Sequence, residues 1–451
     1  MKSPLGSRVS LVLVSFAATL WARASQGQEP PNPGAGQVAP SAPAPAPAPG
    51  GQPVAAPPAT TPGVVAVQVA PPAPAGTTPA RKWYDAVKVE GFVDAYASVN
   101  ANSPKPQSGQ NLGRAFDATN GFALHWAGLN VSYAPEPVGA TVGLRFGPGA
   151  LLFNAGPDAT AGLAFVKQAF VAWKPVDGVP LQIDFGKFDT WIGAEVADSQ
   201  YNMTYTRSAL FYTQPLFHTG VRVDIAASEQ FDLKLYAVNG YSNSIDNNAM
   251  KTFGATAGFT PVKEVGLYLN YIGGPEQADL APGTMGGAPT VVSGANGRWR
   301  HLADVVADFK FGRGRALVNA DYGTEKLAAG TLAMADPEKS VSWFGGNLTL
   351  GYAVSDFFAL AVRGGYLSDP DGYMAPYWGA PIGQGASVVD GTLTLSVTPT
   401  PNLMIKLEPR IDSVSSDQSG WEGGFPKAPD ASPGFSKTLF TTTLGIVATT
   451  N

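Results

Sequence analysis

Charged and aromatic side chains gather in one long stretch of the chain, residues 189–217. Asp189, Glu195, Asp198 and Arg207 lie there among several tyrosines and other aromatic residues. Held opposite basic side chains across a narrow passage, carboxylates at this density would create a transverse electric field. Such a field sorts ions and small dipolar solutes by charge. We therefore expect this stretch to be a loop that narrows a pore.

The partners for this loop lie in short stretches where charged and apolar residues alternate. Val89 and Val93 fall on one face of residues 87–95, and Glu90 and Asp94 fall on the other. A period of two indicates a strand with one polar and one apolar face. The charged residues that this alternation places on the polar face are predicted to form the pore wall: Asp94, Arg145, Arg222, Asp224, Asp232, Lys234, Asp308, Arg363, Lys406, Glu408 and Arg410.

Enzymatic and metal chemistry find little support in the residues. His125, His218 and His301 are scattered and lack the spacing of a metal site. No G-x-S-x-G nucleophile elbow and no Walker or dinucleotide glycine motif is present. We therefore expect no catalytic residue, no metal and no cofactor, and we interpret the protein as a non-enzyme.

The elements that would position the charged residues are short strands with a regular rhythm. We expect strands at 86–99, 119–134, 138–147, 163–175, 179–188, 218–227, 230–239, 252–261, 264–272, 300–311, 315–323, 341–354, 356–367, 387–398, 402–412 and 436–449. Their connections alternate between short, turn-forming segments and long loops. This asymmetry is typical of a transmembrane antiparallel β-barrel with periplasmic turns and external loops. An even number, about 16 strands, places both barrel termini on the periplasmic side.

Two segments precede the predicted barrel at residues 83–451. Residues 1–24 carry Lys2 and Arg8, an apolar stretch and an A-x-A site ending at Ala24, which is typical of a secretory signal peptide. Residues 25–82 are rich in proline and alanine, so they form no core and are expected to be a disordered periplasmic linker. This linker could also reach as a semi-rigid arm toward the cell wall.

Composition and charge limit the compartment and the partners. The formal net charge is −5, and it becomes −8 without the leader, which holds three basic residues and no acids. An acidic exported protein is a poor candidate for nucleic-acid binding. Charged residues make up only 14% of the chain, which fits a protein with one face in lipid. With no cysteine, there is neither a lipidation site at the leader nor a disulfide framework.

Several segments resemble a known family. These segments are 91–96 (GFVDAY), 185–195 (FGKFDTWIGAE), 205–208 (YTRS), 218–222 (HTGVR), 238–240 (VNG), 246–248 (DNN) and 270–276 (NYIGGPE). Together they are similar to the putative β-barrel porin-2 family of bacterial outer-membrane proteins, best between Gly91 and about Asp304. The resemblance implies a barrel and passive transport and names no substrate. The C-terminus departs from the aromatic ending of outer-membrane barrels, because it reads Ala448-Thr449-Thr450-Asn451.

We therefore expect an outer-membrane porin of a Gram-negative bacterium that lets small hydrophilic solutes or ions diffuse through a water-filled lumen. Its partners would be outer-membrane lipid and the solutes. By analogy with porins, the chain could form a homotrimer. The main alternative is a non-conducting barrel for adhesion or surface structure. A barrel hydrolase that uses His218 or His301 and a soluble exported β-protein are the remaining alternatives.

Overall fold

The computed structural model describes residues 83–104, 111–154, 158–281, 290–292, 294–329, 331–332, 337–427 and 434–450. The expected signal peptide and the proline-rich linker lie outside these residues, so both stay predictions. No helix in the described ranges is long and apolar enough to cross a membrane.

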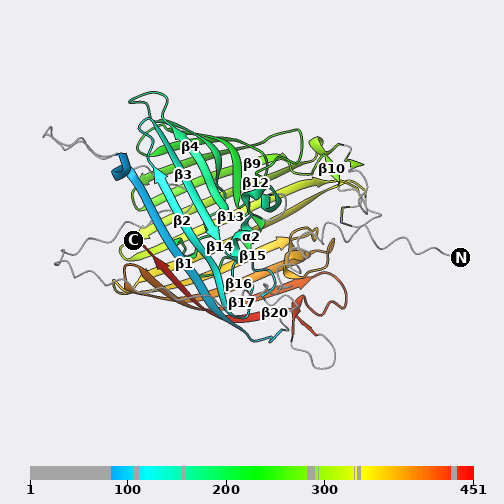
Figure 1. Cartoon of the computed structure of the whole chain (residues 1–451). Helices are drawn as coiled ribbons and strands as arrows, with labels where there is room; N and C mark the ends of the chain where they lie inside the picture. Colours follow the sequence, from blue (N-terminus) through cyan, green and yellow to red (C-terminus); the bar gives the residue numbers. More distant parts are fainter. Residues whose placement is uncertain are drawn as a thin grey trace, which may run out of the picture.

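Sixteen strands of the described chain close into one antiparallel barrel (Figure 1). Each strand pairs with the barrel strands before and after it in the chain, and β20 pairs back with β1, which closes the sheet. The barrel strands are β1 (Val87–Asn100), β2 (Gly121–Tyr133), β3 (Val138–Phe146), β4 (Val166–Trp173), β5 (Leu181–Asp189), β6 (Phe217–Ala226), β7 (Phe231–Val238), β8 (Thr252–Val262), β9 (Val265–Pro275), β12 (Trp299–Phe311), β13 (Gly314–Leu327), β14 (Lys339–Ala353), β15 (Phe358–Asp369), β16 (Ala386–Thr400), β17 (Leu403–Ser416) and β20 (Thr438–Thr449).

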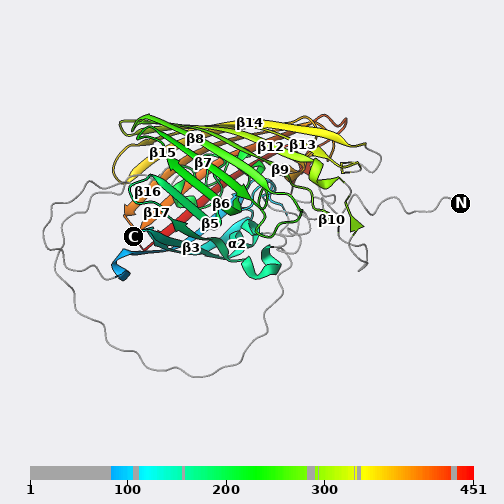
Figure 2. The same cartoon turned by 90° about the horizontal axis from the view of Figure 1, so that it is seen from above.

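The closed sheet of sixteen strands confirms the predicted fold. Each expected strand matches an observed one, and the ends differ by four residues at most. β13 and β17 run furthest beyond the expected ends, because pairing with their neighbours continues there, as between Glu325 and Arg300. The strands run obliquely to one another when the barrel is seen from above (Figure 2). Such a tilt is what closure of a sheet requires.

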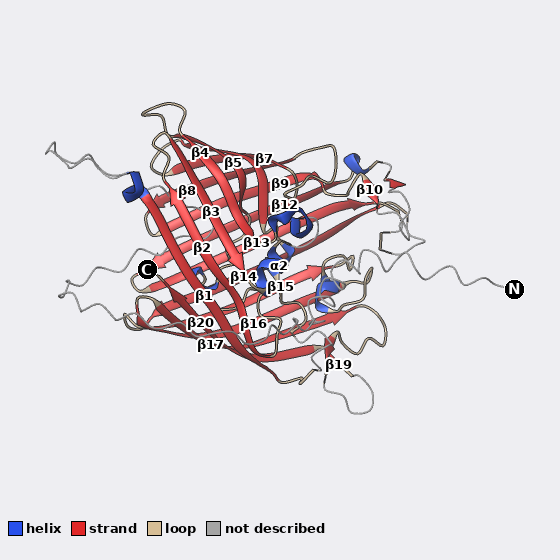
Figure 3. Cartoon of the chain, viewed as in Figure 1, coloured by secondary structure: helices blue, strands red, loops and turns tan. Residues whose placement is uncertain are grey.

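Apart from η1, which precedes β1, the smaller elements occupy the long connections (Figure 3). Two short hairpins, β10 with β11 and β18 with β19, were not expected from the sequence. These elements are η1 (Trp83–Ala86), α2 (Pro148–Phe153), η3 (Ala159–Leu163), η4 (Ser199–Tyr201), η5 (Leu210–Thr213), β10 (Leu280–Ala281), β11 (Thr290–Val291), η7 (Ala295–Gly297), η8 (Ala375–Trp378), β18 (Phe425–Pro426) and β19 (Phe435–Ser436). We call the end of the barrel with the short connections the turn end and the other the loop end.

The two faces of the sheet differ sharply in chemistry. Val89 and Val93 of β1 point outward and are about half exposed. Asp94, the residue after Val93, points inward and is fully buried. The same alternation leaves Leu269 and Val305 exposed on the outer surface of β9 and β12. An outer face of valine, leucine and phenylalanine is suited to lipid, and a polar inner face is suited to a lumen.

The interior is divided along the barrel axis. In the half nearer the loop end, every strand contributes an inward side chain that is at most 3% exposed, and we call this set the sealed ring. Its members are Ser98, Trp126, Arg145, Lys167, Phe188, His218, Val238, Thr252, Ile272, Leu302, Glu325, Trp343, Leu367, Val388, Val414 and Leu439. Nearer the turn end, inward residues such as Gln182 and Thr260 are only partly buried. Water therefore reaches the inner wall mainly from the turn end.

Candidate functional site

The connection between β5 and β6, residues 190–216, lies inside the barrel, and we call it the inner loop. Near its start, the Trp191 ring stacks on Tyr236 of β7, with 3.6 Å between the ring centroids. In its middle, the Tyr205 hydroxyl donates to Asp94 of β1 at 2.7 Å. Because β7 and β1 lie on different sides of the barrel, the loop crosses the lumen.

The acids of the inner loop are bound directly to basic residues of the wall. Arg145 donates from two nitrogens to both oxygens of Asp198, each at 2.9 Å, and Lys167 lies 3.2 Å from the same carboxylate. Arg363 donates to Glu195 at 2.9 Å. Burial alone raises the pKa of Asp198, but Arg145 and Lys167 outweigh it and hold that pKa well below its usual range. These charges are paired contacts that fix the loop.

Charged side chains of the wall also bind the backbone of the inner loop. Glu408 accepts hydrogen bonds from the amides of Tyr205 and Thr206, the second at 2.9 Å. Lys406 donates to the carbonyl oxygens of Ser199 at 2.9 Å and Asn202 at 2.6 Å. An extended segment without a neighbouring strand must satisfy its peptide groups elsewhere. Wall side chains of β17 do so here.

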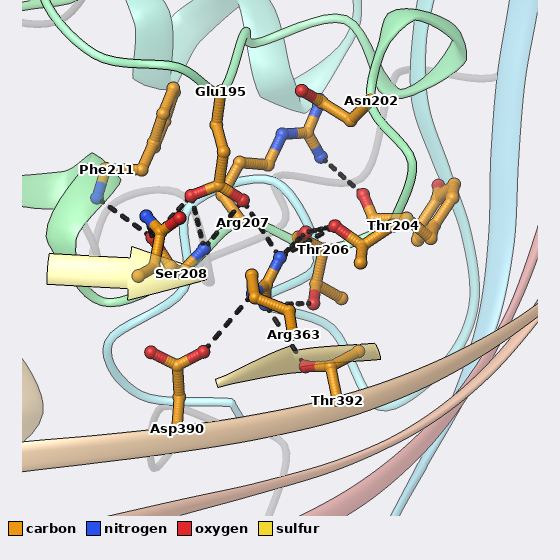
Figure 4. A network of polar contacts seen from close by, with 12 residues as sticks. Glu195, Asn202, Thr204, Thr206, Arg207, Ser208, Phe211, Arg363, Asp390 and Thr392 are labelled. Atoms are coloured by element: carbon orange, nitrogen blue, oxygen red, sulfur yellow. Dashed lines mark hydrogen bonds and ion pairs between the residues drawn. The ribbon is translucent and has the colours of Figure 1, made fainter. Parts of the chain in front are cut away.

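Arg363 and Arg207 complete this arrangement (Figure 4). Arg363 contacts Glu195, Thr206 and Asp390, so it joins the loop to β15 and β16. Arg207 instead donates to carbonyl oxygens of the loop itself, including that of Val196 at 3.1 Å. Its guanidinium also lies 4.9 Å from the centre of the Phe116 ring.

All eleven predicted wall residues point inward, but they fall into two groups. The anchor group binds the inner loop directly and is at most 3% exposed; it consists of Asp94, Arg145, Arg363, Lys406, Glu408 and Arg410. The open group lies toward the turn end and consists of Arg222, Asp224, Asp232, Lys234 and Asp308. The side chains of Arg222, Asp224 and Asp232 are 21–29% exposed.

The open group forms a row of alternating charge around the wall. Lys234 lies between Asp224, at 2.5 Å, and Asp232, at 3.3 Å. Arg222 pairs with Asp184, and Asp308 pairs with Arg315 at 2.8 Å. Sequence reasoning missed Asp184 and Arg315, although the period of two places both on the inward face. It also missed Lys167, which follows a shift in the β3–β4 register.

The sequence analysis also did not identify a pair of buried acids on β12 and β13. Asp304 and Asp321 face each other across β12 and β13, and each is at most 5% exposed. Their described hydrogen-bond donors are amides: Asn270 donates to Asp304 at 2.6 Å, Asn319 contacts both acids, and Gln214 donates to Asp321 at 2.7 Å. Gln214 belongs to the inner loop, so this pair holds the end of the loop near β6.

A small cavity lies between the inner loop and the wall. It is lined on the loop side by Glu195 and residues 201–204. On the wall side it is lined by Arg315, Leu317 and Thr349 of β13 and β14. The cavity therefore brings polar groups of the loop, the Glu195 carboxylate among them, near the basic side chain of Arg315.

The histidines are held in structural contacts. Ser199 Oγ and His125 Nδ1 both contact Asp94 Oδ2, at 2.6 and 2.9 Å. In a Ser-His-Asp triad the histidine stands between serine and acid, and this arrangement differs. His218 contacts Thr190 Oγ1 and the carbonyl oxygen of Gly240, each at 3.1 Å.

A closed barrel with an apolar outer face and a polar inner face defines the class of protein, an outer-membrane β-barrel. The family model described as "Putative beta-barrel porin-2, OmpL-like" matches residues 86–447. The chain belongs to this family of outer-membrane porins, as the resemblance of its motifs predicted.

Solved structures similar to the chain include three outer-membrane proteins. The channel DcaP of Acinetobacter baumannii is 12% identical, with a TM-score of 0.50, and the match covers 80% of this chain and 96% of that chain. OmpT of Vibrio cholerae is 12% identical, with a TM-score of 0.49 and coverage of 80% and 97%. The anion-selective porin from Comamonas acidovorans is 11% identical, with a TM-score of 0.48 and coverage of 80% and 99%. No curated protein sequence matches the chain.

Proposed function

We propose that the protein lets small hydrophilic solutes or ions diffuse passively through its lumen and that it catalyses no reaction. The observation that carries this proposal is the polar, charged inner face of a barrel whose outer face is apolar. A hydrated solute can pass through a lumen of this kind without any covalent chemistry.

The exposed members of the open group, Arg222, Asp224 and Asp232, are proposed to contact passing solutes, and the anchor group to hold the inner loop as a constriction. The partial exposure of Asp224 and Asp232 supports the first role, because a solute in water can approach only exposed charges. The direct ion pairs of Glu195 and Asp198 support the second role. Asp189 also belongs to the constriction, since it contacts Lys167 while 38% of its side chain remains exposed. Arg207 contributes by holding the loop backbone.

The alternation of short and long connections supports a proposed orientation in the membrane. Short turns and both barrel termini are proposed to be periplasmic, and the long loops are proposed to face outward. The proline-rich segment would then extend into the periplasm as a linker, with the cell wall within reach. A homotrimer is the proposed assembly by analogy with porins, and cross-linking in native membranes would test it.

The test is single-channel recording from the mature protein in planar bilayers with unequal KCl on the two sides. Asp224→Asn combined with Asp232→Asn removes two exposed carboxylates from the wall. We expect the reversal potential to shift toward lower cation preference. Asp356→Asn is the matched control, because that carboxylate is 98% exposed in the turn between β14 and β15. Equal selectivity of wild type and the double variant would remove the open group from the pathway.

The sealed ring favours one second candidate, a non-conducting barrel for adhesion or surface structure. Current recording in planar bilayers separates the two candidates, because a folded barrel that passes no current under any condition is not a porin.

A further inference from the structure

The loop-end half of the barrel is closed by described side chains. The sealed ring contains a residue from every strand, and the apolar members Leu302, Leu367 and Val388 are fully buried. We propose that this half is a gate and that a cap on it must move before solutes pass. The cap consists of residues 111–118, Leu210–Thr213, Ala375–Trp378 and 421–425. The inference rests on the proposed function, because a gate has meaning only in a conducting barrel.

Aromatic packing brings three of the cap segments together, and Phe425 of the fourth belongs to the same hydrophobic cluster as Trp378. The Tyr212 ring lies 5.4 Å from Tyr377 and 6.3 Å from Trp378, centroid to centroid. Trp378 rests so closely on Gly113 that a Cβ atom there would lie 2.1 Å from the indole. The rings of Phe116 and Phe211 lie 6.0 Å apart. Packing between apolar and aromatic side chains therefore holds the cap segments together.

Arg114 forms the ion pair between the cap and the wall. Arg114 is 1% exposed, contacts Asp412 of β17, and donates to Thr441 of β20 at 2.8 Å. The same guanidinium contacts Asp117 within the cap at 2.9 Å.

Other groups also bind the cap: Asp369 accepts from the amide of Ala375, and Tyr241 donates to the carbonyl oxygen of Thr213, each at 2.7 Å. Leu210–Thr213 is the part of the inner loop that the cap includes. Opening of the cap would therefore break these contacts as well as the ion pair of Arg114.

Hydrogen bonding in the cap is incomplete. Asp117 Oδ1, Tyr212 Oη and Trp378 Nε1 are buried and have no hydrogen-bond partner within the described residues. Buried polar atoms are normally paired, so these atoms raise the free energy of the closed cap. Opening would expose them to water and remove that penalty. Apolar packing therefore stabilises the closed cap, and the polar atoms without partners destabilise it.

The apolar part of the ring supports gating by drying. A constriction lined by apolar side chains excludes water and ions even when its diameter would admit them. Leu302, Leu367, Val388 and Val414 provide such a lining on one side of the ring, in the same hydrophobic cluster as Trp378 of the cap, whereas Arg145, Lys167 and Glu325 are charged members of the ring. Below them, inward residues such as Gln182 are partly exposed. Solutes from the turn end would reach the inner loop but not cross the ring.

Single cysteines test which half of the lumen contains water, since the natural chain has none. Val388→Cys probes the sealed ring, and Gln182→Cys is its matched control near the turn end. Both are treated in planar bilayers with a charged methanethiosulfonate reagent. We expect Gln182→Cys to react from the turn-end side at least about tenfold faster than Val388→Cys reacts from either side.

Trp378→Ala tests the cap itself. Removing the indole from its contact with Gly113 should raise the fraction of time the channel conducts by at least about tenfold. Trp299→Ala is the control, because Trp299 lies outside the cap at the start of β12. It should leave the open fraction unchanged. Val388→Cys combined with Trp378→Ala should then react as fast as Gln182→Cys.

The outcomes separate the gate from the pore. Steady conduction by the wild type with rapid modification of Val388→Cys overturns the gate and keeps the porin. Protection of Val388→Cys, with no current from either wild type or folded Trp378→Ala, overturns the proposed function and the gate with it. Protection together with a higher open fraction in Trp378→Ala supports both.

Discussion

At the residue scale, the contacts of Asp198 show how a charge can sit inside a barrel. Its carboxylate is 2% exposed and receives two hydrogen bonds from Arg145 and one contact from Lys167. Removing water from three charges is costly, and only their mutual attraction offsets it. Loss of Asp198 would leave Arg145 buried without its ion-pair partner.

Asp198→Asn should therefore lower the free energy of unfolding by about 3 kcal/mol, because the buried Arg145 loses its counter-ion, while Lys167 keeps its contact with Asp189. Urea unfolding of the barrel in lipid vesicles measures this change. Asp224→Asn serves as the control and should cost about 1 kcal/mol or less, since the Asp224 side chain is 29% exposed. Similar losses in the two variants would show that the Asp198 pairs do not hold the loop.

At the scale of elements, a carboxyl next to β9 fastens the connection between β7 and β8. Glu276 accepts from the Tyr241 amide and from the Thr252 hydroxyl, each at 2.7 Å. Burial raises the pKa of Glu276 to about 7, with Glu325 adding to the rise and Arg300 opposing it. The group therefore keeps its proton in the folded protein where the unfolded chain would already have lost it.

The sign of the pH effect follows from this difference. Between the ordinary value of 4.5 and about 7, the folded state binds more protons, so its stability falls as pH rises through this range. We expect the Tyr241 amide to have a lower hydrogen-exchange protection factor at pH 8 than at pH 5.5. Glu276→Gln should remove the dependence. Unchanged protection across this range in the wild type would contradict the prediction.

At the scale of the whole molecule, the lipid-facing surface requires apolar side chains, as the lumen requires polar ones. Val305 of β12 points outward and is 46% exposed. Val305→Arg should destabilise the barrel in bilayers by about 2–4 kcal/mol, because the charge would lie in hydrocarbon. Val305→Leu, which keeps the apolar character, should cost less than 1.5 kcal/mol, about the usual limit for such exchanges. Equal unfolding free energies for the two variants would place this face outside the membrane.

The alternation of residues predicted all sixteen strands and put all eleven wall candidates on the inward face. This succeeded because side-chain direction in a strand depends only on neighbouring positions along the chain. It did not reveal Lys167. This residue has no partner at the register shift between β3 and β4, where Leu144 pairs with Val166 and Gly143 with Gln168, so the strict alternation is interrupted there. The hairpins at β10–β11 and β18–β19 were also missed, because their strands are only two residues long.

The sequence by itself therefore determined the barrel, its strand number and the polarity of its two faces, because these depend on local alternation and turn chemistry. Only the tertiary structure decided which charges meet. Glu195 and Arg363 are 168 positions apart, and they pair because the inner loop folds back into the closed barrel. The split between anchor and open groups and the sealed ring have the same origin. They depend on how long loops fill an enclosed volume, a property that no local pattern contains.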